Sequence, residues 1–551
     1  MKKVELKCHD IDCSSGAGIC KYQGKNITVP YLLPKEVGVV EIDEARSYNK
    51  YKLNRVLKPA SNRIDPGCGI YNRCGSCHLL HMNYDSQINL KKDYVIKCLK
   101  ENKIDSKINE VVTATTKEGY RNKMQVAYKM RDGEMIYGFY EEESHKVIPL
   151  KFCKVHTKKQ NAICKSILDV MKQMKIAPYN EDKRTGIIRF VVVREAFKTN
   201  EILVTIVTNS EIFPGRSEFV KRLVNKCPYI TTIIQNINKR KTSIILGDDE
   251  KLLYGKGFIS ESICNIDFKI SSKTFFQVNP EATEKLYNKV LEYANLTGKE
   301  IVIDAYCGVG TIGMVLSSKA KEVYGVEVNK QSVINARQNA YDNKIKNIKF
   351  VCDDATEYLF ELSKEKVDID LVVMDPPRSG STEKFIDSLC KLKPKKIIYI
   401  SCEASTLARD LNYLFKKCKD YEIKEKTIVD MFVGTYHVET LVCLSKKTEK
   451  HIWIDVEFGE GEGQVSLKKL QEELNEQKPK KKTTYKDIQA YIEEKYGFKV
   501  HTAYIAEVKR DLGLTMYDAP NAVEELKRPR SHPTTEMVEA IKDALKYFAI
   551  I

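Results

Sequence analysis

Five short apolar runs follow one another between residues 301 and 402, and polar or glycine-rich residues end each of them. The runs occupy residues 301–303, 323–326, 350–352, 371–374 and 397–400. Runs of this length that are rich in Val and Ile are typical of strands buried on both faces of a parallel sheet. Ligands of such sheets bind outside the carboxyl ends of the strands. The sequence therefore predicts a Rossmann-like, doubly wound domain over residues 271–446, with its site at that edge.

The residues that follow these runs suit a nucleoside ligand. The first run leads into DAYCGVG (304–310), whose glycines allow the backbone to approach a ligand closely. The second run ends at Glu327, and a carboxylate at that point can bind ribose hydroxyls. Because the first turn is D-x-Y-C-G-x-G and not G-x-G-x-x-G, the sequence favours S-adenosylmethionine over a dinucleotide.

Cys402 lies where the fifth run ends and a helical pattern, residues 405–411, begins. A thiol at the carboxyl end of a strand can face a substrate, and a helix N-terminus favours its thiolate form. The simpler alternative is a small buried hydrophobic residue, which is what most cysteines are. The neighbouring motifs favour a catalytic thiol.

Composition limits the classes of protein to consider. The chain has 551 residues, a formal net charge of +16 and 17 cysteines. Its length predicts about three to five domains, and its charge suits a polyanionic partner, nucleic acid first. The sequence has no long apolar run and no apolar signal core at its N-terminus, so we expect a cytoplasmic protein without a membrane partner. An odd cysteine number in such a chain favours metal or catalytic roles over disulfides.

Cys68, Cys74 and Cys77 form a C-x5-C-x2-C cluster among Gly and Pro residues, which predicts a metal-binding loop. A fourth ligand is needed, and we expect Cys153 rather than His78 or His81. Four thiolates suit either an iron–sulfur cluster or structural zinc. The spacing favours the cluster, because zinc sites more often have two separated C-x-x-C pairs.

The rest of the α/β multidomain chain divides by pattern. We expect an OB-like β-barrel, a cysteine-rich region in two parts, a helix followed by a central α/β RNA-binding domain, a basic linker and a helical extension. In the same order, the five regions occupy residues 1–62; 63–83 with 145–160; 84–270; 447–484; and 485–551. In the central domain, Tyr120, Arg121 and Lys123 could contact RNA or belong to an ordinary solvated strand. The extension suggests helix-turn-helix, with nucleic-acid binding or plain packing as its roles.

Five motifs together resemble one family, the RNA uridine-5-methyltransferases. They are FFQVN (275–279), DAYCGVG (304–310), DPPRSG (375–380), YISC (399–402) and HVET (437–440). The N-terminal barrel resembles the TRAM domain of this family. The cysteine set resembles the subgroup that has a [4Fe-4S] cluster and acts mainly on large-subunit ribosomal RNA. The resemblance covers residues 1–446.

The resemblance implies a function and a role for each site residue. It implies transfer of a methyl group from S-adenosylmethionine to carbon 5 of uridine, in 23S ribosomal RNA or alternatively in transfer RNA, by a monomer. Cys402 would add to carbon 6 of the ring, and Glu439 would remove the carbon-5 proton. The residues expected to contact the methyl donor are Gln277, Tyr306, Glu327 and Asp375. The resemblance also assigns Cys68, Cys74, Cys77 and Cys153 to the [4Fe-4S] cluster, with structural zinc as the alternative.

Three departures from the family pattern bear on the reaction rate and the RNA target. In the barrel, Pro34-Lys35-Glu36 replaces Pro-Gly-Glu. Glu403-Ala404 replaces the usual Asn-Pro after the nucleophile, and a carboxylate pointing toward the thiolate would oppose its ionisation. Phe432-Val433 replaces Phe-Pro near the base. A catalytically impaired RNA-binding paralogue is therefore one alternative. An adenine amino-methyltransferase is another, but it would need no nucleophilic Cys402, and Arg378 fits its motif poorly.

Overall fold

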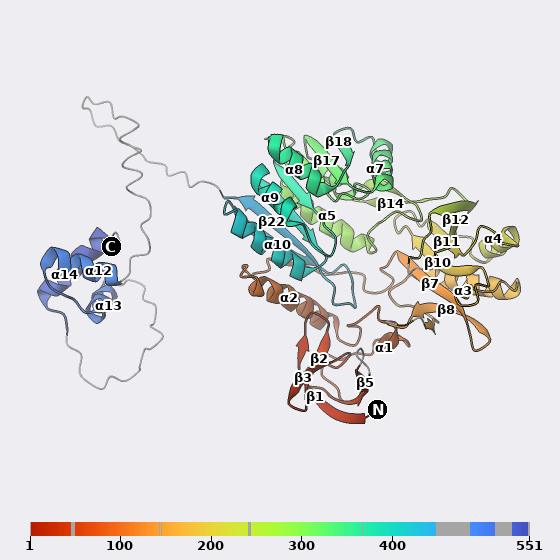
Figure 1. Cartoon of the computed structure of the whole chain (residues 1–551), viewed down its shortest axis with the longest axis horizontal. Helices are drawn as coiled ribbons and strands as arrows, with labels where there is room; N and C mark the ends of the chain where they lie inside the picture. The colour runs from red at the N-terminus through yellow and green to blue at the C-terminus, as the bar shows by residue number, and fades with distance from the viewer. Residues whose placement is uncertain are drawn as a thin grey trace. The chain divides into compact units, whose positions relative to one another are not determined.

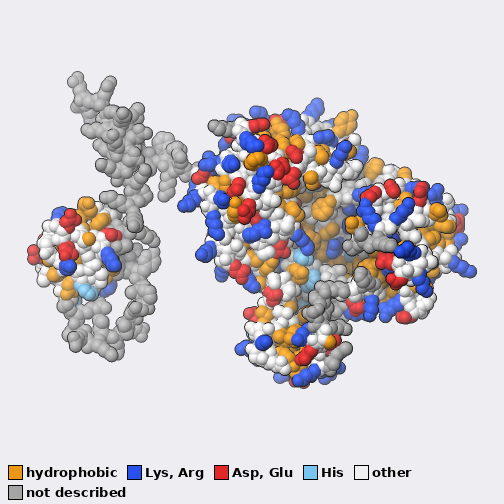
Figure 2. All heavy atoms as spheres, in the orientation of Figure 1, with side chains coloured by type: hydrophobic (Ala, Val, Ile, Leu, Met, Phe, Trp, Pro, Cys, Tyr) orange, Lys and Arg blue, Asp and Glu red, His pale blue; other side chains and the backbone are white. Residues whose placement is uncertain are grey.

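The computed structural model divides the chain into two compact units, Met1–Glu449 and Lys450–Ile551 (Figure 1). It describes residues 2–45, 50–142, 144, 146–240, 244–365, 367–447, 485–512 and 532–548. No helix among these described residues is long and apolar enough to cross a membrane. Figure 2 shows Lys and Arg side chains over all parts of the visible face of the first unit.

A five-stranded antiparallel sheet begins the chain, in the order β3-β2-β1-β4-β5. Its strands are β1 (Lys2–Asp12), β2 (Ala17–Tyr22), β3 (Lys25–Val29), β4 (Val37–Ile42) and β5 (Tyr51–Lys58). The two edge strands lie close to each other, so the sheet curves around a core that includes Leu6, Cys20 and Val40. The alternation of buried and half-buried residues along β4 matches a sheet with one face in the core.

The central domain is built on a mixed seven-stranded sheet in the order β13-β12-β11-β10-β7-β8-β9. Its strands are β7 (Lys123–Arg131), β8 (Glu134–Tyr140), β9 (Val147–Pro149), β10 (Ile188–Glu195), β11 (Ile202–Thr208), β12 (Thr232–Ile237) and β13 (Asp249–Tyr254). Helices α3 (Lys158–Gln173) and α4 (Arg216–Lys226) share one hydrophobic core with it. Every residue of β10 and β11 is buried, which explains their continuous apolar runs.

The third domain confirms the predicted doubly wound sheet. Its eight strands follow the order β18-β17-β16-β19-β20-β22-β21-β6. They include β16 (Ile301–Ala305), β17 (Glu322–Glu327), β18 (Ile348–Cys352), β19 (Leu371–Met374), β20 (Lys396–Ser401), β21 (Tyr421–Val429) and β22 (Glu439–Lys446). The first five strands of this order are parallel, whereas β22 is antiparallel to both of its neighbours.

Helices cover both faces of this sheet, and each face has its own core. One core includes side chains of α5 (Pro280–Ala294), α6 (Thr311–Ser317) and α7 (Lys330–Asp342). The other includes side chains of α2 (Tyr84–Glu101), α8 (Ala355–Glu365), α9 (Glu383–Leu392) and α10 (Ala404–Lys417). Helices on both faces of a largely parallel sheet define the doubly wound architecture.

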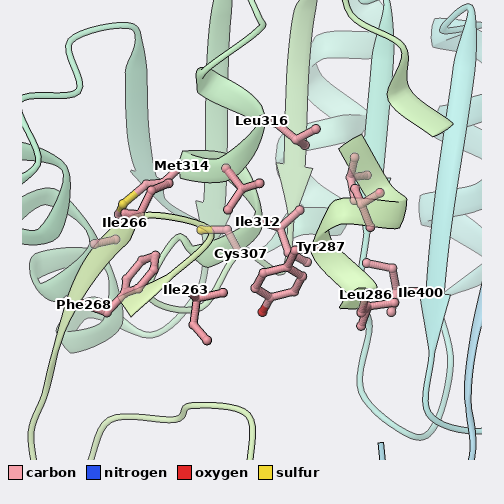
Figure 3. Close-up of a cluster of buried hydrophobic side chains, with 14 of the residues drawn as sticks. Ile263, Ile266, Phe268, Leu286, Tyr287, Cys307, Ile312, Met314, Leu316 and Ile400 are labelled. Carbon is pink, nitrogen blue, oxygen red and sulfur yellow. The ribbon is translucent and has the colours of Figure 1, made fainter. Parts of the chain in front are cut away.

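Two segments differ from the sequence-based domain boundaries. Helix α2 packs on this third domain, and β6 (Glu110–Val112) pairs with β21, although the sequence grouped residues 84–270 together. The hairpin of β14 (Ile259–Ile263) and β15 (Ile266–Ile270) also belongs to the core of the third domain. Figure 3 shows side chains of this hairpin beside those of α5 and α6. Contacts between residues far apart in the sequence set these boundaries, so local sequence patterns do not reveal them.

The second unit contains α12 (Tyr485–Tyr496), α13 (Thr502–Asp511) and α14 (Thr535–Tyr547). Their buried residues form one small core. Ile488 and Ile492 of α12 and Ile505 and Val508 of α13 lie in it. The predicted basic linker falls almost entirely on residues 448–484, outside the described residues.

A buried ion pair fastens α2 to the third domain and provides a test of this packing. Lys91 Nζ on α2 lies 2.5 Å from Asp430 Oδ1, and each side chain is 1% exposed. Replacing Lys91 with Ala should lower the free energy of unfolding by about 3–5 kcal/mol, because Asp430 would stay buried without its partner. The matched control is Lys100→Ala, an exposed position on the same helix, which should change it by less than about 0.5 kcal/mol. Equal losses in urea unfolding of the two variants would contradict this role.

Candidate active site

Three of the predicted donor-binding residues lie side by side at the carboxyl edge of the sheet. Strand register pairs Ala305 of β16 with Val326 of β17 on one side and with Met374 of β19 on the other. The next residue on each strand is therefore Tyr306, Glu327 or Asp375. The parallel sheet thus brings together residues that are up to 69 positions apart in the sequence.

The turn after β16 is fixed to the end of β17. Tyr306 has a φ of +63°, and the backbone N–H of Gly308 donates a 3.0 Å hydrogen bond to Glu327 Oε2. The N–H of Asn329 donates to the other carboxylate oxygen at 2.8 Å. At Gly310, with a φ of +81°, a Cβ atom would lie 2.5 Å from the Phe350 ring. These glycines are required by backbone geometry and by close packing.

Sequence reasoning did not single out Asp304, the last polar residue inside β16. Its buried carboxylate accepts a 2.7 Å hydrogen bond from the N–H of Gly313 in α6. Burial raises the pKa of Asp304 to about 7, and the charges of Asp375 and Glu327 add to the shift. Burial also raises the pKa of Asp375 to about 7. The only sequence feature that could have identified Asp304 was its position in DAYCGVG, between the strand and the glycines.

The segment before α5 lies between the central and third domains. Asn122 donates from Nδ2 to the carbonyl of Gln277 at 2.9 Å, and its own N–H donates to the carbonyl of Val278. Asn279 caps α5 and donates to the carbonyl of Met431 at 3.1 Å. These bonds fix the chain from Gln277 to Asn279, and the side chain of Gln277 is half-buried.

Cys402 and Glu439 end two adjacent strands. The register of β20 and β22 pairs Ser401 with Thr440, so one further step places Cys402 opposite Glu439. Burial raises the pKa of Glu439 to about 8, with a further contribution from Asp375 and an opposing one from Arg378. Burial, followed by the Glu439 charge, raises the pKa of Cys402 to about 11, which Arg378 again opposes. The two predicted catalytic residues therefore share one electrostatic environment.

Glu403, the residue that departs from the family pattern, is turned away from the thiol. Its Oε1 atom accepts hydrogen bonds from Tyr94 Oη at 2.5 Å and from Ser405 Oγ at 2.8 Å. It is the N-cap residue of α10, where a carboxylate is favourable. In this position the carboxylate caps the helix and bonds α2 instead of facing Cys402.

The four predicted metal ligands, Cys68, Cys74, Cys77 and Cys153, line one cavity of about 330 Å³. Within the described ranges, no three His, Cys, Asp or Glu side chains are close enough to hold a single metal ion. The four thiols thus share one cavity with other side chains. Of the two alternative ligands, His81 bonds Tyr71 Oη through Nδ1 at 2.6 Å, and the His78 ring packs on Tyr436.

Positive charge lies beside these thiols. Arg121 and Lys123 line the same cavity, and Arg121 Nε is buried without a hydrogen-bond partner. Burial lowers the pKa of Lys123 to about 8, and the nearby charges of Arg194 and Arg121 lower it further. Half-buried cations next to four thiols fit a negatively charged group bound by thiolates. Tyr120, by contrast, is buried and donates to the carbonyl of Val433, so it is not exposed for RNA contact.

A family model and curated relatives match this chain over most of its length. The family model described as tRNA (uracil-5-)-methyltransferase matches residues 83–447. A Clostridium tetani protein described as an uncharacterized RNA methyltransferase is 38% identical over 79% of this chain and 95% of its own length. A protein from Halalkalibacterium halodurans with the same description is 36% identical over 81% of this chain and 97% of its own length.

One solved structure is similar over most of the first unit. The crystal structure of the tRNA (uracil-54, C5)-methyltransferase of Pyrococcus abyssi, in complex with S-adenosyl-L-homocysteine, matches with a TM-score of 0.65 and 26% identity. The match covers 80% of this chain and all of that one. The fold and the site thus define an S-adenosylmethionine-dependent RNA methyltransferase. The chain belongs to the tRNA (uracil-5-)-methyltransferase family.

The raised pKa of Glu439 leads to a stability prediction. Its pKa of about 8 lies above the ordinary 4.5, so ionisation favours the unfolded chain as pH rises between these values. Glu439→Gln removes this penalty, so the Tm difference between variant and wild type should increase from pH 5 to pH 8.5. The control is Glu425→Gln, at a half-buried position of β21. A pH-independent difference in thermal unfolding of Glu439→Gln would show that Glu439 is not a destabilised carboxylate.

Proposed function

We propose that this protein transfers a methyl group from S-adenosylmethionine to carbon 5 of uridine in RNA through a covalent adduct with Cys402. The observation that supports this most is the placement of Cys402 opposite Glu439, at the strand edge where Tyr306, Glu327 and Asp375 align. A thiol and a carboxyl base beside a methyl-donor site are the groups that this reaction requires.

The chemistry follows from the poor nucleophilicity of carbon 5. Addition of the Cys402 thiolate to carbon 6 forms a C–S bond and moves the ring electrons into an enolate. Carbon 5 of the enolate attacks the sulfonium methyl group, and the S–CH3 bond breaks to release S-adenosylhomocysteine. Glu439 then accepts the proton from carbon 5. The electrons of that C–H bond restore the ring double bond, and the C–S bond breaks to release the thiolate. A base with a pKa near 8 suits proton removal near neutral pH.

The RNA target is proposed as 23S ribosomal RNA, with transfer RNA as the alternative. The cysteine set supports ribosomal RNA through its resemblance to the iron–sulfur subgroup. The similar Pyrococcus abyssi enzyme is a transfer RNA methyltransferase, which supports the alternative. In either RNA the target uridine must leave its stack to reach a partly buried thiol.

We assign the four-cysteine cavity to a [4Fe-4S] cluster held by Cys68, Cys74, Cys77 and Cys153, with zinc as the alternative. The size of the cavity and the neighbouring Arg121 and Lys123 support the cluster. A cluster bound by four thiolates has a net negative charge, which these cations would offset. The proposed methyl transfer requires no electron transfer, so the cluster would supply structure.

Loss of the nucleophile should stop the reaction but not donor binding. Cys402→Ala should reduce methyl transfer from a labelled donor by about 10⁴-fold or more, because no other group forms the adduct. Binding of S-adenosylmethionine, measured by calorimetry, should stay within about twofold of wild type. The control is Cys390→Ala, a half-buried thiol on α9, which should be near wild type in both assays. Normal turnover by Cys402→Ala would rule out the covalent mechanism.

Protein purified without oxygen should be brown and contain about four irons per chain. Replacing Cys68, Cys74, Cys77 or Cys153 with Ser should remove the colour and the iron. Cys164→Ser, a buried thiol on α3, should retain both. A colourless wild-type protein with one zinc ion would overturn the cluster.

The helical extension should be dispensable for the chemistry, because the proposed site lies within residues 1–447. Acidic and basic residues are nearly equal in number between 449 and 551, so the net positive charge lies in the first unit. Removing residues 449–551 should leave methylation of a short RNA within about twofold of the full-length rate. A loss of more than about tenfold would show that the extension is part of the catalytic unit.

A further inference from the structure

The loop between β21 and β22, residues 430–438, leads directly to Glu439. The cysteine-rich segment contacts this loop at several points. We infer that residues 77–80 of that segment, together with Tyr120, act as positioning residues for the loop and thereby place the carboxylate of Glu439. The inference rests on the proposed function and adds to it a role for the cysteine-rich segment in the proton-removal step.

The first contact is at Gly434. Its carbonyl accepts two hydrogen bonds, from the backbone N–H groups of His78 and Leu79, each 2.8 Å long. Gly434 has a φ of +80°, and a Cβ atom there would lie 2.6 Å from Leu80 Cδ2. Glycine at this position allows both the left-handed backbone of the loop and its close approach to Leu80.

The second contact is at Val433, one of the residues that depart from the family pattern. Its buried side chain packs in a small core with Tyr120, and Cys77 and Cys153 pack against this core. The carbonyl of Val433 accepts a 2.9 Å hydrogen bond from Tyr120 Oη. Two of the four proposed cluster ligands thus pack against the small core that contains Val433.

The third contact is between aromatic rings nearer to the base. The rings of His78 and Tyr436 are 4.4 Å apart, and those of Tyr436 and His437 are 4.5 Å apart. This packing extends the influence of the segment to within two residues of Glu439. Because Glu439 begins β22, a shift of the loop changes how the strand starts and where its carboxylate points.

The opposite side of the loop is held independently of the cysteines. Gln87 Oε1 accepts from the N–H of Gly434 at 3.0 Å, and Lys91 Nζ donates to the carbonyl of Phe432 at 2.9 Å. Asn279 donates to the carbonyl of Met431. With these bonds in place, weakening the cysteine-side contacts should move the loop without unfolding it.

Displacement of Glu439 has a specific chemical consequence. Methyl transfer to carbon 5 precedes proton removal, so a misplaced base leaves the first step intact and slows the second. The adduct between Cys402 and methylated uracil then persists, because its C–S bond breaks only when the carbon-5 proton leaves. Small displacements of a catalytic group are sufficient to slow such a step.

The test uses full-length protein and ordinary uridine-containing RNA. Two variants weaken the cysteine-side contacts: Tyr120→Phe removes the hydrogen bond to Val433, and Gly434→Ala forces Leu80 and the loop apart. Tyr128→Phe is the matched control, because Tyr128 is buried and its hydroxyl bonds the carbonyl of Cys164 in the central domain. Glu439→Gln reports on the base itself. The readouts are the fraction of protein in a denaturation-resistant RNA adduct and the rate of single-turnover methyl transfer.

We expect Tyr120→Phe and Gly434→Ala to accumulate adduct at least fivefold above wild type, with methyl transfer changed less than about twofold. Tyr128→Phe should match wild type, and Glu439→Gln should accumulate the most adduct. If Glu439→Gln accumulates adduct and both loop variants behave like Tyr128→Phe, the positioning role is wrong and the proposed function stands. If Glu439→Gln also accumulates none, the assignment of the base fails, and this inference fails with it.

Discussion

The antiparallel pairing of β20 with β22 is the constraint on which the proposed site depends. In an all-parallel sheet, the first residue of the strand next to β20 would lie at the opposite edge of the sheet, away from Cys402. Because β22 runs the other way, its first residue, Glu439, lies at the carboxyl edge with Cys402. One reversed strand therefore adds the proposed base to an edge that already has Cys402 and the proposed donor-binding residues.

The same edge brings together carboxyl groups that are at least partly shielded from water. Asp304, Asp375 and Glu439 all have pKa values raised by burial, to about 7, 7 and 8. Burying such groups is unfavourable in the free protein. The methyl donor is a sulfonium cation, and its positive charge would offset this cost. The edge is therefore better suited to the cationic donor than to a neutral ligand.

The strand series and the place of Cys402 could be predicted because both depend on local patterns. Apolar runs of fixed length define the strands, and the residue after a strand must lie at its carboxyl end. The place of β6 in the sheet could not be predicted. Its three residues pair with β21, far away in the sequence, and lie against the core that contains α2. The orientation of the Glu403 side chain could not be predicted either, because it depends on Tyr94, which is 309 positions away in the sequence. The contacts of the 430–438 loop were missed for the same reason.

The most direct test of the covalent mechanism is mass spectrometry of the protein trapped on RNA that contains 5-fluorouridine. Fluorine at carbon 5 leaves no proton for Glu439 to remove, so the adduct cannot resolve. The mechanism predicts one protease-derived peptide, containing Cys402, that has gained a fluorinated uridine product with one methyl group from the donor. A trapped peptide that contains a different nucleophile, or methyl transfer to RNA with no adduct at all, would contradict it.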